Sequence, residues 1–329
     1  MEHRFEGYKG TSATPPGPSI RGLWAWTRSQ AVNRSGKRLT TIGTVTTAGG
    51  GYSDAGWVEN AAPTSRFPPL AIGDIWDHRE LIFFFARRDV KVRYKQAFLG
   101  AAWAVLQPLI GAISFTIVFS GLAGIDVEDR SYFAFALSGF VVWSYFSAAL
   151  SNATFSVLHN SELLTKVSFP TIVVPIAAVL PALVDFTVGI VLALIVSLSS
   201  GNGLSAVRLA IGLPLGVVLL MATVVGPALF FSASIVKYRD VGALAALALQ
   251  LLLFISPVAY PPELVPERWL TLYYANPVAG ALGLLRSALV NADLPQVGHL
   301  ALSFGLSFGA LYVGLLFFRA KERAFADII

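Results

Sequence analysis

The chain has 329 residues, of which 55% are hydrophobic and 13% are charged, and its formal net charge is +5. Soluble domains carry roughly 25% charged residues, so this composition excludes an ordinary water-soluble globule and favours a protein embedded in lipid. The chain has no cysteine, which excludes disulfides, cysteine-ligated zinc, iron–sulfur clusters and thiol catalysis.

Residues 1–70 differ in composition from the rest of the chain. They are rich in Gly, Ser, Thr and Pro and carry scattered basic residues. A segment of this composition cannot bury a hydrophobic core. We therefore expect residues 1–70 to form a disordered cytoplasmic tail.

Residues 71–96 are predicted to form an amphipathic interfacial helix. Acidic residues come first and basic residues last, which complements a helix dipole. The residues expected on the apolar side are Ile72, Ile75, Trp76, Phe83, Ala86, Val90 and Tyr94. The residues expected to act at the interface are Trp76, Arg87, Arg88, Lys91, Arg93 and Lys95. Such a helix lies in the headgroup layer of a membrane, and the alternative is a core-packed helix of a soluble domain.

Long apolar runs follow, and a helix needs about 20 residues to cross a bilayer. The runs expected to cross are residues 97–125, 132–158, 171–198, 209–236, 241–260 and 298–318. Basic residues mark cytoplasmic ends, and the runs Arg87–Lys95 and Arg319–Arg323 put both ends of this region inside. Both ends inside require an even number of spans. We therefore expect an all-α polytopic membrane protein with six transmembrane helices.

One further apolar stretch, residues 276–290, is too short for a full crossing and contains Arg286. Irregular backbone at membrane depth is tolerated only inside protein or beside an aqueous cavity. We therefore expect residues 261–290 to form external re-entrant helices near a pathway. The candidate residues of this segment are Pro261, Trp269, Tyr273, Asn276, Pro277 and Arg286.

Motifs for catalysis or nucleotide binding are not found. A phosphate-binding loop needs the pattern GxxxxGK[ST], and the pair Gly36-Lys37 is followed by arginine and lacks the upstream glycine. The histidines are far apart, and no GxSxG elbow occurs. We expect no catalytic residue, metal site or cofactor in this chain, so active transport would draw energy from a partner or an ion gradient.

The predicted spans contain a set of candidate conduit residues. Asp185 is an acid deep inside a span, where a charge is costly; it is either a pathway residue or a structural hydrogen-bond partner for a neighbouring helix. Aromatic faces stack on sugar rings, although such residues also form lipid-facing belts. The aromatic candidates are Phe115, Phe119, Trp143, Tyr145 and Phe146.

The loop at residues 156–169 predicts a short cytoplasmic helix. Glu162 and Lys166 are spaced i,i+4 for an ion pair, and Pro170 ends the helix. Such a helix is either a surface on which a motor subunit pushes or a plain connector. The candidate coupling residues are Ser156, Leu158, His159, Glu162, Leu163, Lys166 and Phe169. Two GxxxG spacings, Gly212/Gly216 and Gly305/Gly309, are weak indications of a dimer face.

Several motifs occur in one order along the chain. They are RRDVKVRYKQAFLGAAWAVLQPL from Arg87, NSELLTKVSFP from Asn160, LVDF from Leu183, VKYRDV from Val236, and FISPVAYPPELVPERW followed by YYANPVAG between Phe254 and Gly280. Together they resemble the ABC-2 type permeases that export polysaccharides, a family that includes O-antigen, capsule and teichoic-acid exporters. The resemblance covers about residues 72–325, and the tail is longer than is usual in the family.

The resemblance implies a homodimeric permease with two copies of a separate ATP-binding subunit, which would hold the ATP and Mg²⁺. It matches residues 156–169 with the coupling helix and residues 261–290 with the external re-entrant pair. The implied function is export of lipid-linked polysaccharide across a bacterial inner membrane, as in lipopolysaccharide biosynthesis, with both termini cytoplasmic. The alternatives are an ABC-2 exporter of drugs or small lipids, and a membrane-embedded glycosyl- or acyltransferase. Such a transferase would need several intramembrane acids or histidines.

Overall fold

The structure is a computed structural model. It describes residues 30–32, 38–40, 72–95, 102–124, 131–167, 169–201, 203–258, 260–322 and 325. They belong to two compact units, Met1–Ala62 and Pro63–Ile329. In the first unit, β1 (Gln30–Val32) pairs antiparallel with β2 (Arg38–Thr40). The rest of the expected tail lies outside the described residues, and its disorder stays a prediction.

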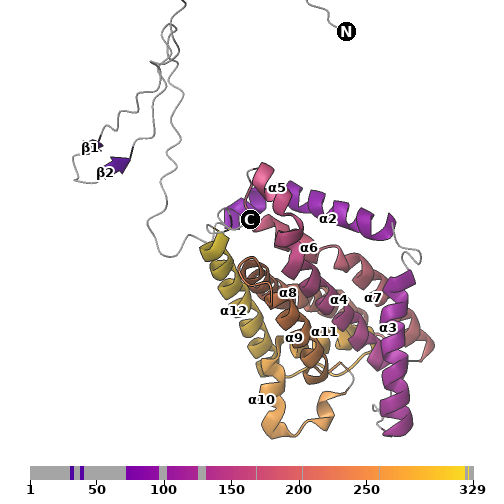
Figure 1. Ribbon diagram of the computed structural model, residues 1–329. Coiled ribbons are helices and arrows are strands. Elements are labelled where there is room, and N and C mark those ends of the chain that lie inside the picture. Colours follow the sequence, from indigo (N-terminus) through magenta and orange to yellow (C-terminus); the bar gives the residue numbers. More distant parts are fainter. Residues whose placement is uncertain are drawn as a thin grey trace, which may run out of the picture. The chain divides into compact units, whose positions relative to one another are not determined.

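The described elements of the second unit are all helical (Figure 1). In chain order they are α1 (Ile72–Asp77), α2 (Arg79–Lys95), α3 (Ala102–Phe115), the π-helical η2 (Thr116–Leu122), α4 (Tyr132–His159), α5 (Ser161–Lys166), α6 (Val173–Val179), α7 (Ala182–Ser199), the π-helical η3 (Arg208–Gly212), α8 (Leu213–Ile235), α9 (Val241–Ile255), the 3₁₀ turn η4 (Pro262–Leu264), α10 (Glu267–Ala275), α11 (Pro277–Leu289) and α12 (Val297–Glu322).

Within the described part of the chain, five helical segments are long and apolar enough to cross a membrane. They are Ala102–Leu122, Tyr132–His159, Val173–Ser199, Arg208–Ile235 and Val297–Glu322. These correspond to five of the six expected spans. The remaining run, residues 241–260, is helical only as α9, which has 15 residues and is therefore about 22 Å long. The helix ends early because Pro257 disfavours helical backbone at Ser256, which is extended.

α4 forms the centre of the bundle. It contacts α3, α6, α7, α8 and α11, and most of its side chains are buried, including Leu137, Tyr145 and Leu150. The helix also carries small residues that let its neighbours approach closely. At Gly139, for example, an added Cβ would lie 2.6 Å from a guanidinium nitrogen of Arg286.

The α8–α12 pair also packs closely. An added Cβ on Gly226 of α8 would lie 2.6 Å from the backbone of Ala310 in α12. One turn away, the hydroxyls of Thr223 and Ser307 form a hydrogen bond of 2.8 Å between the same helices. Backbone approach of this kind requires glycine, since any side chain would push the two helices apart.

The two GxxxG spacings differ in their surroundings. Gly216 faces α11, and its Cβ would lie 2.7 Å from the side chain of Leu285. That pair therefore serves packing within this chain. Gly305 and Gly309 on α12 have nothing within 4 Å of an added Cβ, so this part of α12 is open in the single chain.

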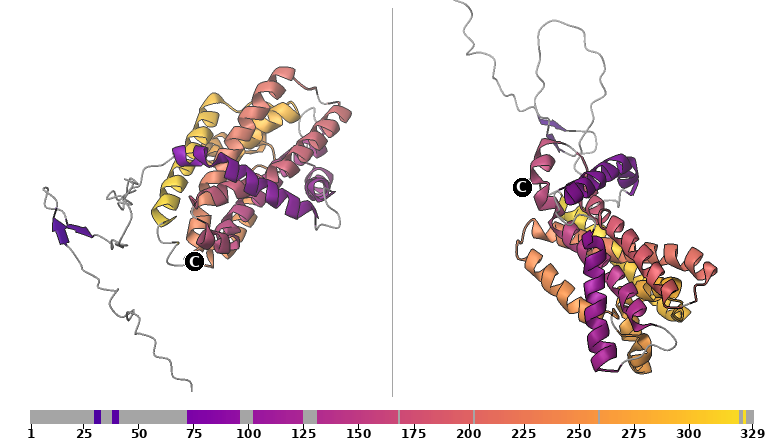
Figure 2. Two further views of the ribbon diagram at one scale, coloured as in Figure 1. Left: turned by 90° about the horizontal axis from the view of Figure 1, so that it is seen from above. Right: turned by 90° about the vertical axis from the view of Figure 1, so that its right-hand side faces the viewer.

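The second unit has two distinct ends (Figure 1). α2 and α5 lie at one end, and the left view of Figure 2 shows α2 running across the bundle. α10 lies at the opposite end. We call these the α5 end and the α10 end.

Candidate functional site

α2 packs on the bundle through a narrow apolar face. Ile82 and Phe85 are buried and share one hydrophobic cluster with Val173 and Ala177 of α6. The ring of Phe85 also lies 5.7 Å from that of Phe169, which follows α5. α2 is thereby fixed both to α6 and to the segment that leaves α5.

The apolar side expected to lie in the headgroup layer stays a prediction, because burial within one chain does not report contact with lipid. Of the residues expected on that side, Trp76 and Phe83 are 70% and 67% exposed, and Ala86 is buried. The sequence pattern was ambiguous because aromatic residues occur on both sides of α2. The contact with α6 decides which of the two sides is buried. The exposed side of α2 carries Arg87, Lys91 and Lys95 together with the rings of Phe83 and Phe84.

Asn160 connects α2 to α5. It is the residue before α5, and its Oδ1 accepts a hydrogen bond of 2.9 Å from Nη2 of Arg88. Its Nδ2 donates to the Ser156 carbonyl at 2.8 Å, which fixes the side chain against the end of α4. In α5 itself, Glu162 and Lys166 are 3.6 Å apart and exposed, as the i,i+4 spacing predicted.

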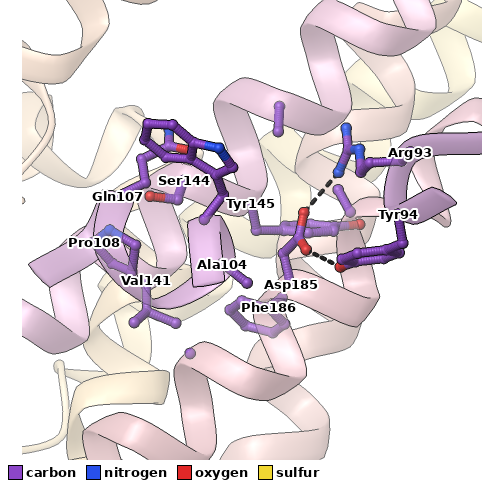
Figure 3. A pocket seen from close by; sticks show the side chains of 14 residues that line it. Arg93, Tyr94, Ala104, Gln107, Pro108, Val141, Ser144, Tyr145, Asp185 and Phe186 are labelled. Carbon is purple, nitrogen blue, oxygen red and sulfur yellow. Dashed lines mark hydrogen bonds and ion pairs between the residues drawn. The ribbon is translucent and has the colours of Figure 1, made fainter. Parts of the chain in front are cut away.

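Asp185 connects the other end of α2 to α7. Nη1 of Arg93 lies 2.6 Å from Oδ2 of Asp185, and the hydroxyl of Tyr94 donates to Oδ1 (Figure 3). Burial, together with this bond to Asp185, raises the pKa of Tyr94 to about 12. Asp185 belongs to the first turn of α7 and lies near the middle of the apolar segment Val173–Ser199, as expected. It bonds a neighbouring helix, as the structural alternative predicted.

A cavity of about 260 Å³ lies beside this ion pair. Figure 3 shows Asp185 and Tyr145 among the side chains that line it, with Gln107 and Ser144 from α3 and α4. Tyr145 is 2% exposed, and its hydroxyl has no hydrogen-bond partner among the described residues. The cavity wall therefore combines aromatic side chains with an ion pair, and the hydroxyl of Tyr145 is buried.

The other aromatic candidates do not line this cavity. Phe115 and Phe119 stack on each other at 5.3 Å, and Phe115 also packs edge-on against Phe140 at 4.9 Å. Trp143 and Phe146 are buried and lie 5.5 Å apart. In the single chain these four candidates make packing contacts.

A second, more open cavity of about 710 Å³ lies between α2, α4 and α6. Ser156 and His159, two of the candidate coupling residues, line it together with Arg88, Arg93 and Asn160. Leu163 and Phe169 instead pack against the cluster of α2 and α6, and Leu158 is partly buried. At the α5 end, most of the candidate coupling residues therefore lie beside α2, either lining this cavity or packing against the cluster of α2 and α6.

The candidates from residues 261–290 lie at or near the α10 end. Pro261 and Tyr273 line one small cavity together with Arg286. Asn276 caps α11, whose first residue is Pro277, by accepting from the Val278 amide at 3.1 Å. Trp269 is exposed on α10. Among the described residues, no cluster of three or more histidines or acids could hold a metal ion.

The family model of the ABC-2 type transporter matches residues 80–290, more than half of the chain. The chain belongs to the ABC-2 type transporter family. It is 25% identical over 252 residues to an O-antigen export system permease protein RfbA of Klebsiella pneumoniae, covering 76% of this chain and 95% of the relative. It is 23% identical to RfbA of Myxococcus xanthus, covering 78% and 98%. It is also 23% identical to the polysialic acid transport protein KpsM of Escherichia coli, covering 72% and 92%.

These members of the ABC-2 family are export permeases for O-antigen and polysaccharide, and they cover most of this chain. The family match runs from α2 to the end of α11. It therefore contains the Arg88–Asn160 and Arg93–Asp185 connections and the α10 end.

The sequence alone did not identify three residues that contact α2 or line the Asp185 cavity in this ABC-2 protein. Tyr94 was expected on the apolar side of the helix, and Gln107 was not singled out. Asn160 was noted only as the first residue of the motif NSELLTKVSFP, without a role of its own. A polar residue directly before a short helix is a capping signal, so Asn160 could have been found, but its bond to Arg88 joins positions 72 residues apart and leaves no local pattern.

Proposed function

We propose that this chain is the permease subunit of an ABC transporter that exports lipid-linked polysaccharide across the cytoplasmic membrane. Two copies of the chain form the path, and two copies of a separate ATP-binding subunit hydrolyse ATP with Mg²⁺. The named functions of the relatives, O-antigen export and polysialic acid transport, support this substrate class.

The observation that carries the proposal is the continuous connection from α5 to α7. α5 is a short helix between two long apolar segments, and its Glu162 and Lys166 are exposed. Asn160 at its start holds Arg88, and the last turn of the same α2 holds Asp185 in α7. A partner that pushes on α5 therefore moves α2 and the span containing α7 together. A plain connector would not need these bonds.

We further propose six crossings with both termini in the cytoplasm. The sixth is α9, whose 15 residues fall short of a bilayer core of roughly 30 Å and are continued by the non-helical residues 256–258. α2 lies in the cytoplasmic headgroup layer, because its exposed side mixes aromatic rings with basic residues. α10 and α11 form the external re-entrant pair.

The proposed conduit includes the cavity at Asp185 and Tyr145. An aromatic wall beside the Arg93–Asp185 ion pair suits a sugar ring, which offers both apolar faces and hydroxyl groups. Phe115, Phe119, Trp143 and Phe146 remain candidates for the surface that two copies of the chain would form together.

The test is reconstitution of the permease with its candidate ATP-binding subunit in proteoliposomes. We expect the two proteins to co-purify, ATP hydrolysis to require the permease for full rate, and lipid-linked glycan to become accessible to an enzyme enclosed in the vesicle. A permease that binds no ATP-binding subunit would contradict the proposal. Transport of dyes or short lipids without glycan would favour the alternative exporter class.

A further inference from the structure

Arg286 of α11 is a buried cation in the apolar part of the protein. It is 3% exposed. Its Nη1 donates to the carbonyl of Pro257 at 2.7 Å and its Nη2 to the carbonyl of Val258 at 2.5 Å. The guanidinium carbon also lies 3.6 Å from the centre of the Phe135 ring in α4.

A buried cation is costly, and these contacts compensate for it. Both carbonyls belong to the stretch that follows α9, where the chain is no longer helical. At membrane depth such carbonyls have no water to bind and need a donor from the protein. A positive charge beyond the last turn also suits the helix dipole of α9. Arg286 thus makes the early end of α9 possible.

Neighbouring residues leave room for the bonds from Arg286 to Pro257 and Val258, and hold the residue before them. Gly139 of α4 faces it, and an added Cβ there would collide with the Val258 carbonyl and lie 2.6 Å from Nη2. From the start of α11, Nδ2 of Asn276 donates to Oγ of Ser256 at 2.8 Å. Three successive residues after α9 are therefore held by the two ends of α11.

α9 has few other attachments. Gly242 and Ala245, near its start, are its buried residues. A Cβ on Gly242 would lie 2.7 Å from the Phe155 ring of α4, close to α5. Further along, Leu251 and Phe254 are exposed in the single chain, whereas Leu249, Leu252 and Leu253 pack against the core with partly buried side chains. α9 is thus fixed near α5 by packing, and at the α10 end by hydrogen bonds together with these partly buried leucines.

We propose that Arg286 is a latch on α9. Its bonds to Pro257 and Val258 hold the α10 end of α9 in the resting state, and their release is a step of the transport cycle. Hydrogen bonds of one side chain to two carbonyls can break and re-form without unpacking a core, whereas the packed start of α9 stays in place and acts as the pivot. The placement of this step in a transport cycle rests on the proposed function; the latch itself does not.

Hydrogen exchange measured by mass spectrometry tests the latch in the permease alone. Arg286→Met keeps the length of the side chain and removes both donors. We expect amides in the last turn of α9 and at Val258 to exchange about tenfold faster, because hydrogen bonds to a charged donor are lost, while α8 and α12 keep their protection. The matched control is Arg268→Met on α10, an exposed arginine that lies over the Trp269 ring, and it should change nothing.

Gly139→Ala provides a second variant, which leaves the arginine unsubstituted and places a methyl group against both the Val258 carbonyl and Nη2 of Arg286. If Arg286→Met fails to fold, Gly139→Ala carries the same expectation. Normal protection of α9 in the folded variants would overturn the latch. In the complete complex trapped with ATP, we expect the wild-type chain to lose protection at the same amides, and equal protection with and without ATP would overturn its role in the cycle. Failure of the two subunits to associate would instead count against the proposed function.

Discussion

Arg93 at the end of α2 forms an ion pair with Asp185 at the start of α7, with 2.6 Å between Nη1 and Oδ2. Both side chains are roughly one-third exposed. The pair connects a helix that crosses the bundle with one that runs through it. Together with the bond from Arg88 to Asn160, it fixes α2 at two separate points.

The ion pair should contribute measurably to stability. We expect a double-mutant cycle of Arg93→Gln and Asp185→Asn to give a coupling energy of about 1 kcal/mol, because a partly exposed pair is screened by solvent. The measurement is denaturant unfolding of the purified permease in detergent. Lys166→Gln, which breaks the exposed pair with Glu162, is the control and should leave the unfolding curve unchanged. Additive effects of the two variants would contradict the expectation.

The contribution of Tyr94 should be lost at alkaline pH. Its pKa is raised from 10.0 to about 12 in the folded chain, so the unfolded chain releases this proton first. Its stabilising effect is therefore complete below pH 10 and falls as the pH rises towards 12. We expect Tyr94→Phe to remove this part of the alkaline slope, measured as unfolding free energy between pH 9 and 12. Identical slopes would show that Tyr94 is not responsible.

The bond between Arg88 and Asn160 should matter for coupling rather than for folding. We expect Arg88→Ala to lower glycan export severalfold at an unchanged rate of ATP hydrolysis, because α5 then moves without α2. The measurement is the ratio of glycan exported to ATP hydrolysed in proteoliposomes. Arg87→Ala, at the exposed neighbouring position, is the matched control. A normal ratio for Arg88→Ala would exclude this connection as the coupling route.

Tyr145 and Trp143 should behave differently when substituted. The Tyr145 hydroxyl has no hydrogen-bond partner among the described residues, so Tyr145→Phe should cost no stability while reducing export if the cavity receives sugar. Trp143 is 8% exposed and packed, so Trp143→Ala should cost about 3–5 kcal/mol. Thermal unfolding and export measured in parallel separate the two effects. Unchanged export in a stable Tyr145→Phe variant would remove Tyr145 from the conduit.

The close approach of α8 and α12 predicts a contrast between two glycines. Gly226→Ala should destabilise the permease by about 1–3 kcal/mol, because the added methyl meets the backbone of Ala310. Gly309→Ala on the open part of α12 has no atom within 4 Å and should be neutral in the isolated chain. Unfolding of the two variants under identical conditions provides the comparison. Equal losses would mean that the helices can separate to accept a side chain.

Much of the bundle could be predicted from hydropathy, because five of the expected spans need only length and apolar composition to be recognised. The burial of α2 could not be predicted in the same way. Phe83 and Phe85 are equally apolar, and only the position of α6 decides that Phe85 is the buried one. The length of α9 depends on Pro257, which disfavours helical backbone at Ser256. This local effect could have been recognised from the sequence, but the continuous apolar run led to a predicted span that continues to residue 260.

The site was less predictable than the fold, because its bonds join distant positions. Asp185 was recognised as unusual, but its partners in α2 precede it by more than 90 residues. Arg286 was noticed as an argument against a full crossing, and nothing nearby in sequence indicated that two carbonyls almost 30 residues earlier accept its hydrogen bonds. Local patterns predict helices well, whereas such pairs are decided by the packing of the whole bundle.

The dependence of Val258 on Arg286 also has a consequence for how the chain is made. Arg286 follows Val258 by 28 residues, and a ribosome adding 5–20 residues per second needs roughly 1–6 s to produce that length. During this interval the carbonyls after α9 have no donor from their own protein. α9 therefore cannot reach its final state alone in the nascent chain, and α9 to α11 must mature as one unit. In a ribosome-bound chain that stops short of Arg286, the carbonyls of Pro257 and Val258 would lack this donor in the membrane.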